Sequence, residues 1–302
     1  MELDLFRSFV TVAEARSFSR AARAMHSTQP TLSRQIARLE NELGTRLFER
    51  YGRHVECTVT GQLLLPLAQA IITRTDEAIS LIREQAGTGS GTVRFGAVGN
   101  VMAILLTPIL ASFFAAYPRV SVDLIEKDDA QLEEAVISGE LDCAVVTPWG
   151  STRTDTQHLL TEEILLVMPR GHPLAKESSV ELSMLANESI LLPRAGLNAG
   201  NVTADALRQA GLEPRISRRA NYPELTKALV KTGVGIAPMP KMVAAPETLD
   251  GLVAVPFREP LYRDLNLIFP RDRPLTASAR ALMVHIRAAI SGRGGGDQTC
   301  SP

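Results

Sequence analysis

Apolar residues near the start of the chain recur at the spacing of short helices. Residues 3–15 carry a broad apolar face, and residues 18–25 place apolar side chains at positions i, i+3, i+4 and i+7. A third stripe runs through residues 29–43 and stops before Gly44, which is suited to end a helix in a left-handed conformation. Hydroxyl side chains in the interruption at residues 26–28 can cap the next helix. The pattern predicts three helices with a tight break between the second and the third.

The third of these helices has a polar face opposite its apolar stripe. This face holds Gln29, Thr31, Ser33, Arg34, Gln35 and Arg38. Residues 15–39 contain five arginines and no acidic residue, whereas residues 1–60 together contain nine arginines and seven acidic residues. Arginine and glutamine can form paired hydrogen bonds with base edges, and hydroxyls can contact phosphates. Two crossed helices with the second in the major groove form a helix-turn-helix; on charge alone, a solvated basic helix is the alternative.

The predicted DNA surface has base-reading and backbone-contacting residues. We predict that Gln29, Ser33 and Arg34 read bases. The residues predicted to hold the DNA backbone or to complete the surface are Ser27, Pro30, Thr31, Arg38, Arg50 and Arg53. The last two belong to residues 49–58, which predict a wing of two short strands around a glycine turn. A plain solvated hairpin is the alternative for this segment.

A long helix is predicted over residues 60–86, with Thr60 as its N-cap. Its apolar residues approximate a seam with three- and four-residue spacing: Leu64, Leu67, Ile71, Ala78 and Ile82. Such a seam, with little protein nearby to cover it, suits a partner helix. Pro66 lies beyond the first turn, so we expect it to bend the helix near Gln62. The glycine-rich residues 87–91 match no phosphate-binding motif and predict a flexible hinge.

From residue 92 onward, strand patterns alternate with helix patterns, as is typical of a parallel α/β sheet. The predicted strands are 93–98, 120–126, 142–146, 164–168, 189–192, 215–220, 235–238, 252–256 and 265–269. Two crossings of the chain, near Glu163 and Phe269, divide these strands into two lobes with a cleft between them. An amphipathic helix over residues 277–290 returns to the first lobe, and the glycine-rich end of the chain predicts a disordered tail.

Ligands of open α/β sheets bind beyond the carboxyl ends of the strands, near helix N-termini. The loops that meet this description hold Val98, Gly99, Asn100, Val101, Thr147, Trp149, Pro193, Arg194, Asn198, Tyr222 and Ile236. Backbone amides at residues 98–101 favour an anion, and Arg194 can hold a carboxylate at two points. The alternatives are simple turns, core or surface packing for Trp149, and a structural ion pair for Arg194. The convergence of these loops predicts a site for a small, anionic organic molecule.

One stretch of the chain resembles a known protein family. The run Ser-Thr-Gln-Pro-Thr-Leu-Ser at residues 27–33 is followed at fixed spacing by Ile36, Leu39, Glu40, Leu43, Gly44, Leu47, Phe48, Arg50, Thr60 and Gly61. This pattern resembles the N-terminal signature of LysR-type transcriptional regulators. The many matched positions make the resemblance specific, and the length and layout of the rest of the chain match that family more loosely.

The resemblance implies an α+β multidomain fold with an N-terminal winged helix-turn-helix, a long linker helix and a C-terminal two-lobed α/β domain like a periplasmic binding protein. Residues 1–59 are the expected DNA-binding domain, 60–91 the linker helix and hinge, and 92–302 the effector-binding domain. Within the last, lobe I comprises residues 92–163 and 269–292, lobe II residues 164–268, and the tail residues 293–302.

The resemblance also implies partners. Family members bind double-stranded promoter DNA, sense a small organic inducer and pair two subunits through the linker helix, so a dimer and then a tetramer are expected, with RNA polymerase as a further candidate partner. Many members have Ser or Thr where Gly99 and Asn100 stand, and Gly where Lys127 stands, followed by a polar ligand contact at the position of Asp128. Lys127 and Asp128 therefore join the predicted effector-binding residues, and the differences leave the inducer's identity open.

Composition narrows the class of protein. A chain of 302 residues predicts two or three domains, and its 32 basic and 33 acidic residues nearly cancel. Cys57, Cys143 and Cys300 are too few and too scattered for a disulfide framework, which favours reduced thiols. The N-terminus lacks the pattern of a signal peptide, and no apolar run approaches the roughly 20 residues that span a bilayer. We expect a cytoplasmic protein.

Motifs for catalysis are missing from the sequence. The five histidines are dispersed without metal-ligand spacing, and no nucleophile elbow is present. We therefore predict no metal, no cofactor and no catalytic residue. The alternative function is a small-molecule-binding protein or an enzyme whose N-terminal helices serve assembly only. The acid-free face of residues 15–39 separates the two hypotheses, because an assembly domain does not need it.

Overall fold

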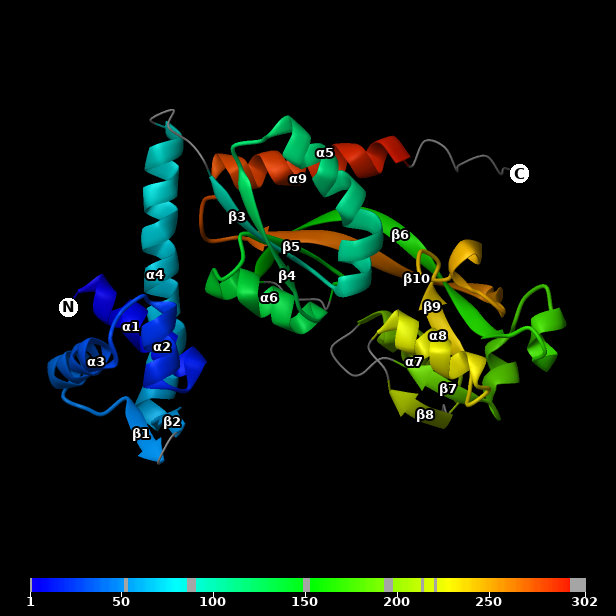
Figure 1. Ribbon diagram of the computed structural model, residues 1–302. Helices are drawn as coiled ribbons and strands as arrows, with labels where there is room; N and C mark the ends of the chain where they lie inside the picture. Colours follow the sequence, from blue (N-terminus) through cyan, green and yellow to red (C-terminus); the bar gives the residue numbers. More distant parts are fainter. Residues whose placement is uncertain are drawn as a thin grey trace. The chain divides into compact units, whose positions relative to one another are not determined.

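The computed structural model describes residues 2–51, 54–85, 91–148, 153–192, 198–212, 215–219 and 222–293 (Figure 1). The chain separates into two compact units, the first made of residues 1–89 and the second of nearly all residues from 90 onward. In the described part of the chain, no helix is both long and apolar enough to cross a membrane.

The first unit begins with the three predicted helices, α1 (Leu3–Ala15), α2 (Phe18–Ala24) and α3 (Gln29–Leu43). Their apolar faces enclose one core, which includes the fully buried Phe9, Leu32 and Leu39. The Thr28 hydroxyl accepts a hydrogen bond from the Thr31 backbone N–H (3.4 Å) and caps α3. Gly44 ends the helix with φ at 69°, so the predicted caps at both ends of α3 are confirmed.

The predicted wing is a pair of antiparallel strands, β1 (Phe48–Tyr51) and β2 (His54–Cys57). The long helix α4 (Val59–Gln85) follows directly. Its N-cap is Thr58, not Thr60: the Thr58 hydroxyl accepts from the Gly61 N–H (3.0 Å) and donates to the Arg46 carbonyl (2.8 Å). The prediction of Thr60 is wrong because the helix starts two residues earlier.

The outer surface of α4 differs from the predicted seam at one position. Leu64 packs against the core of the first unit, together with Leu65 and Ile72. The exposed apolar positions instead include Leu63 (68% exposed) and Leu67 (61% exposed). The stripe is therefore one residue out of the predicted register at its N-terminal end. Pro66 lies inside α4, which continues past it as one helix (Figure 1).

The second unit is built on one six-stranded sheet with the order β4-β3-β5-β10-β6-β9. Its strands are β3 (Thr92–Ala97), β4 (Ser121–Glu126), β5 (Cys143–Val146), β6 (Thr154–Pro169), β9 (Ala237–Pro240) and β10 (Leu252–Pro270). The first three pair in parallel, as predicted, but β10 is antiparallel to β5 and β6. The sheet is therefore mixed.

Helices cover the first half of this sheet on both sides. They are the π-helical segment η1 (Val101–Leu106), α5 (Thr107–Ala116), α6 (Asp129–Ser138) and α9 (Ala277–Arg293). Figure 1 shows α5 and α9 together on one side and α6 on the other. The enclosed core includes Phe95, Phe113 and Leu132, and it defines the first lobe. The return of the last helix to this lobe is confirmed by Leu282 and Ile286 in the same core.

The second lobe lies around the other half of the sheet. It adds the parallel pair β7 (Ser189–Leu192) and β8 (Arg215–Arg219), the helices α7 (Asn198–Gln209) and α8 (Pro223–Lys231), and the 3-10 turns η2 (Pro173–Lys176), η3 (Leu182–Leu185) and η4 (Pro246–Thr248). Its two clusters of apolar side chains are built around Ile164, Ile190 and Phe257 and around Val167, Val230 and Leu252.

The two lobes are joined by β6 and β10, which run through both. The strands predicted at 252–256 and 265–269 are one strand, with a register shift between Pro256 and Leu261. Leu265 and Leu267 pack in the core of the first lobe, so the return crossing lies earlier than the predicted Phe269. The polar residues between the two apolar runs make the sequence look like two strands. The backbone hydrogen bonds of an antiparallel pair do not depend on apolar side chains, so the strand continues through this exposed stretch.

Candidate functional site

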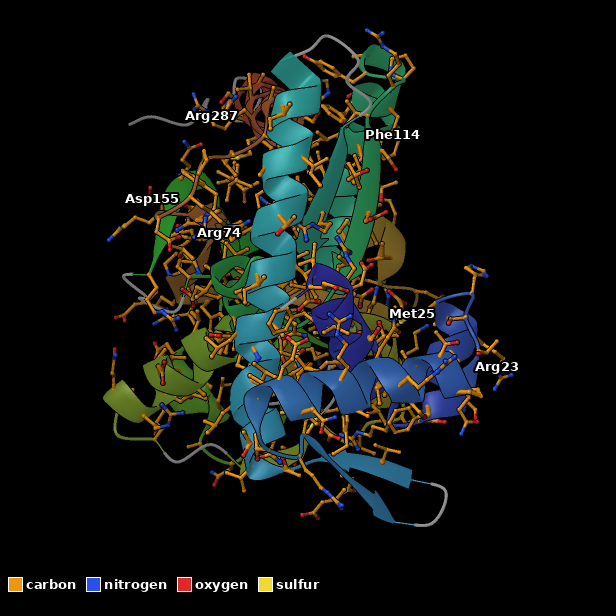
Figure 2. All side chains as sticks on the ribbon, turned by 90° about the vertical axis from the view of Figure 1, so that its left-hand side faces the viewer. Arg23, Met25, Arg74, Phe114, Asp155 and Arg287 are labelled. Atoms are coloured by element: carbon orange, nitrogen blue, oxygen red, sulfur yellow. The ribbon has the colours of Figure 1, made fainter. Side chains whose placement is uncertain are left out.

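The N-terminal end of α3 is the exposed part of the helix-turn-helix. Gln29, Pro30 and Arg34 are exposed, whereas Thr31 and Ser33 are half-buried. The Ser19 hydroxyl of α2 donates to the Gln29 side-chain oxygen (2.9 Å), which orients the amide and leaves its N–H₂ to act as a donor. Arg23, labelled in Figure 2, projects from the end of α2 into solvent.

Arg34 and Arg38 lie one turn apart on α3 but differ in their partners. Arg34 Nε donates to the Pro30 carbonyl (3.4 Å), and no carboxylate pairs with it among the described residues. Arg38 forms a two-point ion pair with Glu2 (2.8 and 3.1 Å) and a further bond to Glu42 (3.1 Å). The hydrogen bond and the charge of Glu2 raise the pKa of Arg38 above its usual value. Of these two arginines, Arg34 is therefore the one whose guanidinium is available to a ligand.

Gln35 and Ser27 lie differently from the other residues predicted around α3. Gln35 does not belong to the outer polar face, because its side-chain oxygen accepts from the hydroxyl of Ser8, a fully buried residue of α1 (2.9 Å). It joins α3 to α1 instead. The half-buried Ser27 sits at the break, where its N–H donates to the Ala22 carbonyl (2.8 Å).

The wing arginines fall partly outside the described residues. Arg50 lies on β1 opposite Val55, but the structure does not describe its side chain. Arg53 lies outside the described residues altogether.

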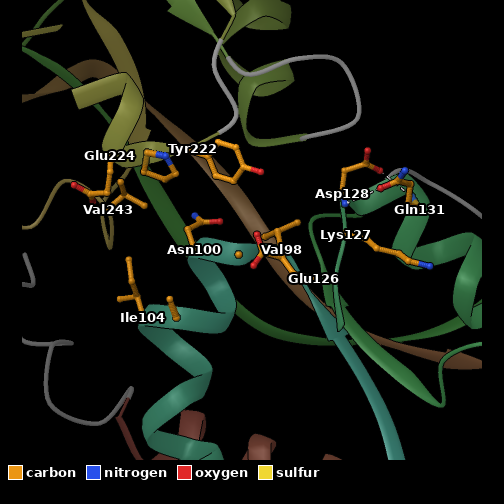
Figure 3. Close-up of a pocket in the computed structure, with 13 residues that line it drawn as sticks. Val98, Asn100, Ile104, Glu126, Lys127, Asp128, Gln131, Tyr222, Glu224 and Val243 are labelled. Carbon is orange, nitrogen blue, oxygen red and sulfur yellow. Dashed lines mark hydrogen bonds between the residues drawn. The ribbon is translucent and has the colours of Figure 1, made fainter. Parts of the chain in front are cut away.

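A cavity of about 650 Å³ opens between the lobes of the second unit (Figure 3). Of the predicted effector residues, those that line it are Val98, Gly99, Asn100, Lys127, Asp128 and Tyr222. They come from the loops after β3 and β4 and from the residue before α8. The cavity also has lining residues that were not predicted, namely Ala103, Ile104, Glu126, Gln131, Pro223, Glu224 and Val243.

Other predicted effector residues lie elsewhere. Val101 and Ile236 are buried in the apolar cores, so they are not lining residues. Thr147 is 5% exposed, and its N–H donates to the carboxylate of Asp129 (2.8 Å) at the start of α6. Trp149, Pro193 and Arg194 lie outside the described residues, as does the side chain of Asn198. Burial of Val101 and Ile236 follows from their places at the start of a packed helix and beside β7.

The charged groups of the cavity are mainly acidic. Glu126, Asp128 and Glu224 line it, against Lys127. Asp128 is the cap of α6, since its carboxylate accepts from the Gln131 N–H (2.9 Å) and the Gln131 side chain accepts from the Asp128 N–H (3.3 Å). Glu224 pairs with the buried ammonium of Lys227 (2.8 Å). The sequence could have indicated Glu126, because it is the last residue of the predicted strand that became β4. No signal in the sequence indicates that Val243 lines the cavity.

A buried ion pair joins the strands where they pass between the lobes. Arg263 of β10 and Glu162 of β6 are paired at 2.8 Å with side chains only 2% and 7% exposed. The other oxygen of Glu162 accepts from the Met242 N–H (2.5 Å), just after β9. The pair thus links β6 and β10 to the segment after β9, which also contains the cavity residue Val243. Among the described residues, no group of three or more His, Cys, Asp or Glu side chains has the arrangement of a metal site.

Comparison with known proteins identifies both units. Residues 3–62 match the bacterial regulatory helix-turn-helix protein, lysR family, and residues 86–291 match the LysR substrate binding domain. The transcriptional dual regulator GltC of Bacillus subtilis (strain 168) is 33% identical over 282 residues, covering 92% of this chain and 94% of GltC. The DNA-binding transcriptional dual regulator OxyR of Escherichia coli (strain K12) is 31% identical over 286 residues, covering 94% of each chain.

Solved structures agree on the fold. Full-length BenM is 28% identical with a TM-score of 0.61, covering 97% of this chain and 98% of BenM. CbnR, a LysR family transcriptional regulator, superposes with a TM-score of 0.72 at 23% identity, covering 96% of this chain and 99% of CbnR, and supports the fold alone. The named relatives are regulators of transcription and not enzymes. The chain therefore belongs to the LysR family of transcriptional regulators, with an N-terminal helix-turn-helix and a C-terminal effector-binding domain.

Proposed function

We propose that this protein binds a specific promoter sequence through α3 and that a small organic effector, bound between the two lobes, sets its activity. The observation that carries the DNA-binding part is Arg34, an exposed arginine without a carboxylate partner in the described part of the chain. It lies in a segment, residues 15–39, that has no acidic residue. A guanidinium in this state can form a two-point contact with guanine.

The other contacts follow from position on the same surface. Gln29, with its amide oriented by Ser19, and the half-buried Ser33 are proposed to read bases beside Arg34. Ser27, Thr31, Arg50 and Arg53 are proposed to hold phosphates, and Pro30 to set the first turn of the helix. Arg38 is proposed to contribute less than Arg34, because a phosphate would have to displace Glu2 and Glu42 from it.

Self-association is proposed through α4, within the linker segment of residues 60–91. Its exposed stripe includes Leu63, Leu67, Ile71 and Ile82, the last 68% exposed. Apolar residues at this spacing favour a second helix of the same kind. Pairing of two chains would bring two copies of α3 to two half-sites on the DNA. A tetramer would contain two such dimers and could contact two pairs of half-sites.

The effector is proposed to bind in the cavity of about 650 Å³, a volume within the range of small-molecule sites. An anionic effector was expected from the amides of residues 98–101 and from Arg194. Arg194 lies outside the described residues, and three acids face the cavity against one lysine, so the described charges give an anion little support.

Sensing of peroxide through a thiol has no support from the two described cysteines. A relative of 31% identity is the hydrogen peroxide-inducible genes activator of Escherichia coli O157:H7. Here Cys143 is fully buried and Cys57 half-buried, and burial raises the pKa of both thiols. A thiol held protonated is a poor nucleophile toward an oxidant.

The DNA-binding proposal is tested with a gel shift on the gene's own upstream region. We expect a specific complex whose affinity falls steeply with salt, because phosphate contacts release counterions. Absence of any complex at low salt would favour the alternative, in which the N-terminal helices serve assembly only. A promoter fragment of scrambled sequence and equal length is the matched control.

A further inference from the structure

We propose that the cavity between the lobes selects an effector that carries a positive charge, and that the Glu126 carboxylate binds its ammonium or guanidinium group. The inference deepens the proposed function and rests on it for the cavity's role as the effector site. It assigns a chemical class to the ligand and a specificity-determining residue to the site.

Glu126 faces the cavity as a carboxylate that has no partner in the described part of the chain. It is the last residue of β4 and is exposed. Among the described residues, no hydrogen bond or ion pair holds its carboxylate, although it lines a concave site. A lone carboxylate at the wall of a ligand cavity gains a charge-assisted hydrogen bond from a cationic ligand.

Gly99 makes room for this carboxylate. A Cβ atom placed on Gly99 would lie 2.7 Å from the Glu126 Cδ and 3.2 Å from its Oε2, too close for a side chain to be added without displacing the acid. The Glu126 side chain thus lies directly against the backbone that follows β3. Glycine at this position therefore leaves the space that the acid at the end of β4 occupies.

Among the described residues, the other charges that line the cavity do not neutralise Glu126. Glu224 is paired with Lys227 (2.8 Å), and Asp128 caps α6 through the Gln131 N–H (2.9 Å). Figure 3 shows the Lys127 side chain running away from Glu126. A carboxylate ligand placed beside Gly99 would meet the negative charge of Glu126, whereas an amine would meet a hydrogen-bond acceptor of opposite charge.

The remaining walls suit the rest of such a molecule. Val98, Ile104 and Val243 supply apolar surface, and the Tyr222 ring, 67% exposed, lies across from Glu126 on the other lobe (Figure 3). An aromatic face attracts a cation as well as an alkyl chain. The ligand class is therefore a short aliphatic amine or guanidinium compound.

The test is a thermal-shift titration of the full-length protein with three matched probe series: α,ω-diamines, diols and dicarboxylates of three to six carbons, at constant ionic strength. We expect diamines to raise the melting temperature more than diols or dicarboxylates of the same length, since a ligand that binds only the folded state stabilises it. Glu126→Gln should weaken diamine binding about tenfold to a hundredfold.

Asp123→Asn is the control variant. Asp123 is an exposed acid on the same strand and does not line the cavity, so its loss removes the same charge from the domain without touching the site. It should leave the diamine titration unchanged. Gly99→Ser should weaken diamine binding less than Glu126→Gln, because the new side chain shifts the carboxylate but leaves its charge in the cavity.

Equal stabilisation by dicarboxylates, no binding of any diamine, or the same diamine affinity in wild type and Glu126→Gln would each overturn the assignment. These outcomes leave the DNA gel shift intact, so they are distinguishable from failure of the proposed function. Conversely, diamine binding lost in Glu126→Gln, with no promoter complex, would keep the charge assignment and overturn the proposed function.

Discussion

The DNA-facing surface of α3 and the cavity between the lobes are built in opposite ways. The first draws its candidate residues from one short segment of chain, from Ser27 to Arg38, whose helix is capped locally by Thr28, although Glu2 holds Arg38 from a distance in the sequence. The second collects its walls from residues far apart in the sequence, from Val98 to Val243. The surface of α3 therefore depends mainly on one helix, whereas the cavity forms only when the whole sheet and its connecting loops are folded.

This difference predicts how each site responds to change. Substitutions on α3 should act residue by residue on DNA affinity, because its exposed side chains share few partners. Substitutions of the buried residues that place β4, β6, β10 and α8 around the cavity should change stability and ligand binding together, unlike a substitution of a lining side chain such as Glu126.

The largest effect is expected from the buried ion pair between the lobes. Arg263→Met leaves the carboxylate of Glu162 buried and uncompensated, which should lower the free energy of unfolding of the second unit by about 3–5 kcal/mol. We expect loss of effector response along with it, since Glu162 also holds the Met242 backbone. Urea denaturation followed by the fluorescence of the chain's one tryptophan, Trp149, measures the change.

The matched control for that variant is Arg271→Met. Arg271 pairs with Asp155 at 2.9 Å just beyond β10, but the two side chains are 57% and 43% exposed. An exposed pair contributes about 0–1 kcal/mol. Equal losses of unfolding free energy for the two variants would show that burial does not set the cost of losing either pair.

The same contrast explains how much could be predicted from the sequence. The three helices, the Thr28 cap and the Gly44 end were predictable because each signal lies within a few residues of the structure that it sets. The family and the two-domain fold followed from the same stretch. Gln35 was misplaced because its partner, Ser8, belongs to another helix, so helical spacing alone cannot reveal the contact.

Prediction was weaker where tertiary pairing decides. The single strand β10 was predicted as two, because only its pairing with β6 shows that residues 261–264 continue the ladder. Glu126 was overlooked because only the loops beyond the strands were considered, whereas Glu126 is the last residue of β4 itself, and its contact with Gly99 depends on the neighbouring strand β3. Lys127 and Asp128 were predicted from the family resemblance, and both line the cavity.

The next effect concerns DNA affinity. Arg34→Ala should weaken promoter binding by roughly 1–3 kcal/mol and relax specificity at one base pair. Arg38→Ala should cost less, because its guanidinium already binds Glu2 and Glu42. Fluorescence anisotropy with the promoter and its single-base variants measures both. A larger loss of DNA affinity for Arg38→Ala would show that DNA displaces Glu2 from Arg38. The ion pairs of the DNA-free protein would then not predict which arginines contact DNA.

A smaller effect is expected at the start of α4. Thr58→Ala removes the N-cap and should lower the stability of the first unit by about 1 kcal/mol. Thr60→Ala, two residues on and exposed, should stay within about 0.5 kcal/mol of wild type. Thermal unfolding followed by circular dichroism compares the two. If Thr60→Ala were the more damaging variant, the cap would lie where the sequence pattern alone placed it.

The smallest effect is expected for chemical labelling of Cys143, which should not react in the native protein. Cys143 is fully buried in the core of the first lobe, and burial raises the pKa of its thiol, so almost no thiolate is present at neutral pH. Maleimide labelling followed by mass spectrometry should modify Cys143 only as fast as the domain unfolds. Arg263→Met, which destabilises the same sheet, should therefore speed labelling of Cys143 far more than labelling of the half-buried Cys57 in the first unit. Equal acceleration at both thiols would show that the two units unfold together, and the separation between a locally built site and an assembled one would no longer hold for stability.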